Sequence, residues 1–143
     1  MTRTVLFLRI AAVLTFIHAV MHTIGGVFGK VSPGPAAIAV AAMQSNQFLL
    51  LGHMRTLWDF YHGLGLAVTI CLTAEAILFW QLAALAKTDA HRLRPILVTF
   101  LVAYLALAVN ANAYLFFGPV VAEILIAMCL SLAAYNAKPP ATA

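Results

Sequence analysis

Residues 52–65 read GHMRTLWDFYHGLG, and the interpretation of the whole chain starts from this stretch. It places histidine, arginine and aspartate side chains at the start of a long apolar run. At helical spacing Arg55, Asp59 and His62 are expected to share one face of a helix. Polar groups inside a membrane need partners, so the other apolar runs of the chain are expected to supply them.

The composition identifies the class of protein. The chain has 143 residues, of which 64% are hydrophobic and 8% are charged, and its mean hydropathy is +1.01. These values exclude an ordinary soluble globule and indicate an integral membrane protein. A hydrocarbon core of roughly 30 Å takes about 20 apolar residues to cross, so the length allows about four spans.

The apolar runs predict an all-α fold, an integral membrane four-helix bundle that forms a single domain over residues 1–143. The spans are expected at about 5–28, 57–85, 96–117 and 120–135. The first run could be a signal peptide, but His18 and His22 interrupt it, which favours a true span.

The connections between the spans carry their own signals. Residues 36–43 are apolar but too short to cross a membrane, and they predict a short interfacial or lid-like helix between spans 1 and 2. Pro95 is expected in the first turn of the third span. Gly118 and Pro119 are expected to form a tight turn before the fourth span.

The basic residues predict the orientation in the membrane. In the four-span arrangement most of them fall on one side, namely Arg3, Arg9, Lys87, Arg92, Arg94 and Lys138. Lys30 and Arg55 fall on the other side, so both termini are expected in the cytoplasm. The net charge of +4 therefore indicates topology and contact with membrane lipids rather than with nucleic acid.

Polar residues from all four expected spans fall at a similar depth. At about 1.5 Å per residue they lie within roughly 15 Å of the outer membrane edge. They are His18, His22, Asp59, His62, Asn110, Tyr114 and Glu123. Because lone polar groups in hydrocarbon are costly, this clustering predicts a polar cavity in the outer half of the bundle.

Acid/base roles follow from the residue types in this cavity. His62 is the expected general base, oriented by Asp59, and Glu123 is the second acid or base. The residues expected to bind the substrate are His18, His22, Asn110, Tyr114, Trp58 and Arg55. Each has a simpler alternative: Arg55 and Asp59 also suit an ion pair, and Trp58 also suits a membrane-interface anchor. Glu75 points away from Asp59 at helical spacing and is expected outside the cavity.

The histidines leave a cofactor open. His18 and His22, at i and i+4, face the same way and with His62 suit a haem or a metal ion, or simply hydrogen bonds at a helix interface. No CxxC or Cys/His zinc spacing occurs in the sequence, so no dedicated metal site is predicted.

Three segments carry a resemblance to known proteins. They are residues 48–65, the sequence Trp80-Gln81-Leu82 and the sequence Arg92-Leu93-Arg94-Pro95. With these segments the chain resembles small bacterial four-span membrane proteins of unassigned function. The resemblance implies a four-span bundle in the inner membrane of a bacterium and brings no activity with it.

Several functions therefore remain open. The first is a membrane-embedded enzyme, an isomerase or hydrolase, that acts on an isoprenoid, sterol-like or quinone-like molecule by acid/base chemistry. The alternative is a redox protein that binds haem or a metal ion through His18 or His22 and His62. A small proton-coupled transporter using Glu123 or Glu75, possible as a homo-oligomer, and an accessory subunit of a larger complex are further alternatives.

Overall fold

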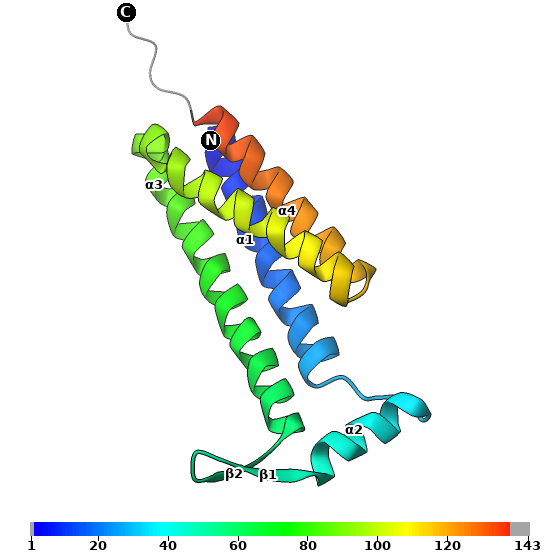
Figure 1. Cartoon of the computed structure of the whole chain (residues 1–143). Coiled ribbons are helices and arrows are strands. Elements are labelled where there is room, and N and C mark those ends of the chain that lie inside the picture. Colours follow the sequence, from blue (N-terminus) through cyan, green and yellow to red (C-terminus); the bar gives the residue numbers. More distant parts are fainter. Residues whose placement is uncertain (1, 138–143) are drawn as a thin grey trace, which may run out of the picture. The chain divides into compact units, whose positions relative to one another are not determined.

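The computed structural model describes residues 2–137 and is mostly helical. Its elements are α1 (Arg3–Met21), the π-helix η1 (His22–Val27), α2 (Pro35–Ser45), β1 (Gln47–Leu50), β2 (His53–Thr56), α3 (Leu57–Tyr114) and α4 (Phe117–Asn136) (Figure 1). The helical class and the short helix between the first two long helices are confirmed. The strands β1 and β2 were not expected.

Three helices of the described chain are long and apolar enough to cross a membrane. They are the continuous helix Arg3–Val27, which joins α1 and η1, together with α3 and α4, and the mean hydropathy of each is 2.0. Only 22% to 39% of the residues in their apolar windows are buried. Exposed apolar surface of this extent is typical of a helix that faces lipid, which is consistent with a membrane protein.

Helix α3 is kinked at Asp89 into two arms. Asp89 has φ −144° and ψ 60°, values that are not helical. On either side of it, Phe79 packs edge-to-face on Phe100 with ring centroids 5.1 Å apart, and Tyr104 is hydrogen-bonded to Glu75. Both pairs join residues at comparable separations before and after Asp89, so the two arms run antiparallel (Figure 1).

The boundaries expected at two prolines are wrong. The helix resumes directly after Asp89, so Pro95 lies inside α3 rather than at the start of a helix. It is the sixth residue after Asp89 and so lies beyond the first turn of the second arm, where its missing N–H removes one backbone hydrogen bond of the helix. Helix α4 begins at Phe117, so Gly118 and Pro119 belong to its first turn and do not precede it.

The chain forms two compact units, one from residues 1–18 and 72–143 and one from Ala19–Cys71. The described part of the larger unit has a single apolar core, to which α1, both arms of α3, and α4 contribute. Many core residues are alanines, which let helices approach closely. These alanines are Ala11, Ala12, Ala83, Ala86, Ala127, Ala133 and Ala134.

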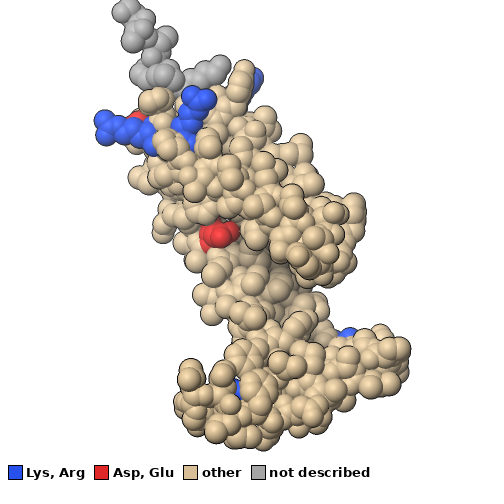
Figure 2. Space-filling model, in the orientation of Figure 1, with Lys and Arg blue, Asp and Glu red and all other residues tan. Residues whose placement is uncertain are grey.

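The basic residues of the larger unit gather at one of its ends. Helix α1 begins there at Arg3, and the kinked part of α3 carries Lys87, Arg92 and Arg94. Figure 2 shows this concentration of basic side chains, with a largely uncharged surface beyond it. Asp89 in the kink forms a salt bridge with Arg92, at 2.8 Å between Oδ2 and Nε.

The smaller unit contains an antiparallel β-hairpin. Leu50 pairs with His53, so Leu51 and Gly52 form a two-residue turn. Both turn residues have positive φ, 48° and 84°, as tight hairpin turns require, and glycine adopts such angles without strain. Phe48 of β1 stacks on Phe60 of α3 with ring centroids 6.1 Å apart, which attaches the hairpin to the helix.

Candidate functional site

A reciprocal pair of hydrogen bonds between Thr56 and Asp59 fixes the start of α3. The Asp59 N–H donates to Thr56 Oγ1 at 3.1 Å, and the Thr56 N–H donates to Asp59 Oδ2 at 2.8 Å. This is a capping box, with aspartate in place of the usual glutamate. It satisfies two N–H groups at the helix start, so β2 ends and α3 begins within one residue. The Asp59 carboxylate therefore has a structural partner.

The prediction that Arg55, Asp59 and His62 share one face of a helix is wrong. Arg55 lies in β2, before the helix, and its guanidinium donates to the carbonyl oxygen of Met54 at 2.9 Å. Asp59 is bonded to Thr56, and within residues 2–137 no hydrogen bond joins it to His62. In this structure Asp59 caps the helix and does not orient the imidazole.

His62 lies among aromatic rings in the smaller unit. Its ring meets the edge of Phe28 with centroids 5.5 Å apart and stacks on Trp58 with centroids 5.9 Å apart. Its Nδ1 atom is buried and has no hydrogen-bond partner in the described part of the chain. A buried polar atom without a partner is costly in a folded protein, so this nitrogen is suited to meet an atom of a ligand.

His22 begins the π-helix η1 and reaches the first turns of α3. Its Nε2 lies 3.0 Å from the carbonyl oxygen of Gly65. A carbonyl oxygen only accepts, so Nε2 carries the hydrogen, and in the neutral ring Nδ1 is then the acceptor. π-Helical segments occur frequently at functional sites.

A second contact between the same two elements involves threonines. Thr23 Oγ1 donates to the carbonyl oxygen of Ala19 at 2.6 Å and lies 3.0 Å from Thr69 Oγ1. Next to it the helices approach closely, because a Cβ atom on Gly65 would lie 3.1 Å from Cγ2 of Val27. Hydroxyl pairs and small residues are typical of helix contacts within membranes.

The larger unit contains a buried polar cluster centred on Tyr104. The Tyr104 hydroxyl donates to Glu75 Oε2 at 2.6 Å and lies 3.5 Å from Thr15 Oγ1. Tyr104 and Thr15 are 1% and 0% exposed. The cluster joins α1 to both arms of α3. An O–H···O distance of this length is typical of a charge-assisted or otherwise strong hydrogen bond.

Glu123 brings a second carboxyl group to the larger unit from α4. Its side chain is 7% exposed, and Oε2 is buried with no hydrogen-bond partner among the residues that the structure describes. The first carboxyl group is that of Glu75, in the first arm of α3. Neither carboxyl group forms an ion pair within residues 2–137. Unpaired carboxyl groups in apolar surroundings are rare and are typically functional.

The other residues of the expected cavity lie in different surroundings. His18 is half-buried at the end of the larger unit's part of α1. Asn110 and Tyr114 are exposed, Tyr114 by 81%, whereas the buried stripe of the second arm runs through Leu97, Tyr104 and Ala108.

The expected site residues divide between the two compact units. His18, Asn110, Tyr114 and Glu123 belong to the larger unit; His22, Arg55, Trp58, Asp59 and His62 belong to the smaller one. Among residues 2–137, no three His, Cys, Asp or Glu side chains lie close enough together to hold a metal ion. A metal ion bound to His62 would therefore have fewer than three protein ligands of these types within residues 2–137.

Sequence reasoning missed the cluster of Thr15, Glu75 and Tyr104. The available signal was symmetry: Glu75 and Tyr104 lie at similar separations from the polar segment around Asp89, which predicts that they meet if the chain reverses there. The capping box was also readable, because Thr56 and Asp59 have the required i, i+3 spacing before an apolar run.

No known protein family, curated protein or solved structure matches this chain.

Proposed function

We propose that the chain crosses a bacterial inner membrane four times, with both termini in the cytoplasm and with α3 supplying two of the spans. The kink at Asp89 supports this, since each arm of α3 exceeds the roughly 20 residues that a span needs. The basic end of the larger unit supports the orientation. In this arrangement α2 and the β-hairpin lie at the outer membrane surface.

We infer further that the protein is a membrane-embedded enzyme that performs acid/base chemistry on a lipophilic substrate, such as an isoprenoid, sterol-like or quinone-like molecule. The observation that carries the inference is the hydrogen bond of 2.6 Å between the buried Tyr104 and the half-buried Glu75, next to the apolar core. Removing a phenol and part of a carboxyl group from water is costly, and a function that needs them would retain them.

The roles of the groups follow from their chemistry. Glu123, whose Oε2 has no partner within residues 2–137, accepts a proton from the substrate. Tyr104 donates its own proton to another position of the substrate and recovers one from water through Glu75, and Glu123 releases to water the proton that it accepted. The substrate gains one proton as it loses one, which is an isomerisation and leaves its net charge unchanged.

The assignment differs from the roles expected from the sequence. Glu123 keeps its acid/base role, and Tyr104 with Glu75 replaces His62 with Asp59 as the proton-transferring pair. Asp59 is left to cap α3, where both of its hydrogen bonds to Thr56 are made. His62 is left to contact a ligand in the smaller unit.

Hydrogen–deuterium exchange at a carbon atom of the substrate tests the proposed enzyme activity. Lipophilic molecules that purify with the protein are extracted, returned to it in deuterated water and analysed by mass spectrometry. Wild-type protein should introduce deuterium into one of them, and Tyr104→Phe and Glu123→Gln should slow the exchange by at least 100-fold. Tyr114→Phe, which alters an exposed tyrosine, is the matched control.

Two results would contradict the proposed enzyme activity. One is deuterium exchange at the same rate in all variants, and the other is no exchange with the wild-type protein. In the second case, proton flux into liposomes that is lost in Glu123→Gln would instead favour the proton-coupled transporter. A strictly monomeric protein without flux would count against that alternative.

A second candidate function rests on His62. Its buried Nδ1 without a hydrogen-bond partner in the described chain, between the rings of Phe28 and Trp58, suits the edge of a planar ligand such as haem. An absorption spectrum of protein from haem-supplemented cells tests it. A Soret band that is lost in His62→Ala and kept in His53→Ala supports haem binding through His62. Absence of the band in wild-type protein contradicts haem binding.

A further inference from the structure

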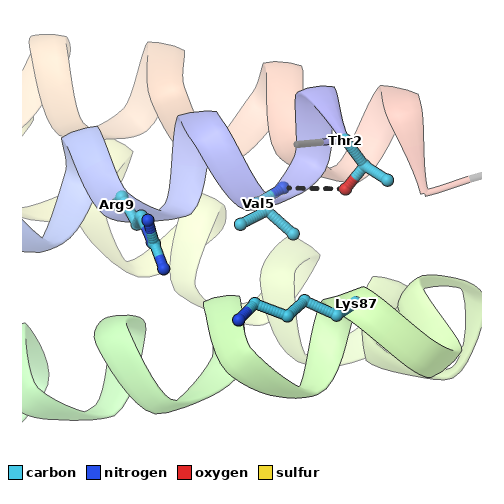
Figure 3. Close-up of a pocket in the computed structure, with 4 residues that line it drawn as sticks. All are labelled: Thr2, Val5, Arg9 and Lys87. Carbon is cyan, nitrogen blue, oxygen red and sulfur yellow. Dashed lines mark hydrogen bonds between the residues drawn. The ribbon is translucent and has the colours of Figure 1, made fainter.

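A pocket in the larger unit lies between the beginning of α1 and the first arm of α3. Its volume is about 370 Å³, and it is lined by Thr2, Val5, Arg9 and Lys87 (Figure 3). This volume falls in the range of about 300–1,000 Å³ that is typical of small-molecule sites. The pocket is separate from the Tyr104 cluster and from His62.

The charged side chains of this pocket come from two different elements. Figure 3 shows Arg9 extending from α1 toward α3, and Lys87 lying along α3 with its ammonium group directed toward the same gap. Two cations that share a pocket repel each other, and an anion between them removes this repulsion. The pocket therefore favours a negatively charged ligand.

The Lys87 ammonium group is not compensated by a neighbouring carboxylate. Among residues 2–137, no acidic side chain lines the pocket. Lys87 forms no ion pair within residues 2–137, and the nearby Asp89 carboxylate is bonded to Arg92 at 2.8 Å. The Thr2 side chain adds a hydroxyl group at the edge of the pocket, where its Oγ1 accepts a hydrogen bond of 3.4 Å from the Val5 N–H.

Arg9 is held in place by an aromatic ring. Its guanidinium carbon lies 5.1 Å from the centroid of the Trp80 ring, a cation–π contact. Trp80 is 53% exposed. An exposed tryptophan beside a cation at the end of an apolar helix is typical of the level of lipid headgroups. The basic pocket thus lies next to a group that marks the membrane surface.

We propose that this pocket binds the phosphate group of an anionic phospholipid. Basic pockets between membrane helices are suited to anionic headgroups, and arginine and lysine are the usual ligands of phosphate. The inference does not depend on the proposed enzyme activity. A free phosphate offers the same chemistry, and the experiment distinguishes the two sources.

The experiment measures lipid retention by native mass spectrometry. The full chain is purified into micelles that contain equal amounts of phosphatidylglycerol and phosphatidylcholine, which differ in net charge. Wild-type protein should retain phosphatidylglycerol preferentially, and Arg9→Gln with Lys87→Gln should weaken this retention roughly 30-fold, since each cation near a lipid phosphate contributes about 1 kcal/mol. Arg3→Gln with Arg94→Gln is the control, because it removes the same charge from the same end and leaves the salt bridge between Arg92 and Asp89 intact.

Several outcomes would overturn the proposal. Equal retention by the wild type and the Arg9/Lys87 double variant overturns the pocket, and equal loss in both double variants reduces the effect to diffuse charge. Inorganic phosphate that binds as tightly as the lipid assigns the pocket to a free anion instead. Should the double variant not fold, Lys87→Gln alone, at an exposed position, should still weaken retention about fivefold.

The emission of Trp80 provides a second readout. In a Trp58→Phe background Trp80 is the remaining tryptophan, so its fluorescence reports on the Arg9 contact. Phosphatidylglycerol should shift this emission at the concentration at which it is retained, and phosphatidylcholine should not. The same shift with both lipids would contradict recognition of the anionic headgroup.

Discussion

The Tyr104 hydroxyl donates a hydrogen bond to Oε2 of Glu75 at 2.6 Å, from one arm of α3 to the other. The bond is made beside the apolar core and close to Thr15 of α1. It fixes the register of the two arms and also places a proton between the Tyr104 phenol and the Glu75 carboxyl group. The predictions below separate this structural effect from a chemical one.

Tyr104→Phe should lower the free energy of unfolding by about 0.6–2 kcal/mol, because it leaves the Glu75 carboxyl group without its partner. Reversible unfolding in detergent by denaturant measures the change. In a double-mutant cycle with Glu75→Gln the two effects should be clearly non-additive. Tyr114→Phe should change nothing, and additive effects of the first two substitutions would contradict a direct interaction.

Glu123→Gln should keep or raise the free energy of unfolding, since Oε2 has no hydrogen-bond partner to lose within residues 2–137. The same substitution should slow deuterium exchange into the substrate by at least 100-fold. A variant that is as stable as the wild type but inactive is the expected sign of a group retained for function. Loss of stability comparable to that of Glu75→Gln would instead indicate a structural carboxyl group.

Asp59→Asn should leave exchange activity within about twofold of the wild type, because the amide oxygen can still accept from the Thr56 N–H. Asp59→Ala should destabilise the start of α3 by about 1 kcal/mol. Amide hydrogen exchange of residues 57–60 measures this local opening. Activity that is lost in Asp59→Asn while amide protection is kept would restore Asp59 to a catalytic role.

Gly65→Ala should destabilise the contact between η1 and α3, because the new Cβ would lie 3.1 Å from Cγ2 of Val27. Combining it with Val27→Ala should recover part of the loss. Gly63→Ala is the matched control: nothing lies within 4 Å of its Cβ position, and replacing glycine in a helix should stabilise by up to about 1 kcal/mol. The measurement is the unfolding midpoint of the wild type, of the two single glycine variants and of the double variant. Equal effects at the two glycines would contradict close packing at Gly65.

The membrane class and the long helices were accessible from the sequence because they depend on composition and on run length. Turn chemistry was less accessible. Arg55 carries no local signal against a helix, and only the pairing of residues 47–50 with 53–56 places it in a strand. The two-residue turn at Leu51 and Gly52 is unusual, since leucine seldom adopts the positive φ found there.

The polar groups show a second limit of sequence reasoning. Counting depth along separate spans groups residues by height but not by the face on which they lie. Tyr114 comes out exposed and Tyr104 buried, although both belong to the second arm of α3. The partner of Glu75 depended on the chain reversing at Asp89, a single residue whose backbone conformation no composition rule predicts.

The reversal at Asp89 also bears on how the protein resists digestion. Trypsin has targets on both sides of it, at Lys87 and Arg92, whereas it does not cut the Arg94–Pro95 bond. Both targets lie in helical turns, and a single residue leaves the helical conformation. Proteases cut extended chain that they can draw into their active sites, and such chain is scarce here. The most basic part of the molecule should therefore be a poor trypsin substrate, and peptides from native protein should keep the two arms of α3 joined.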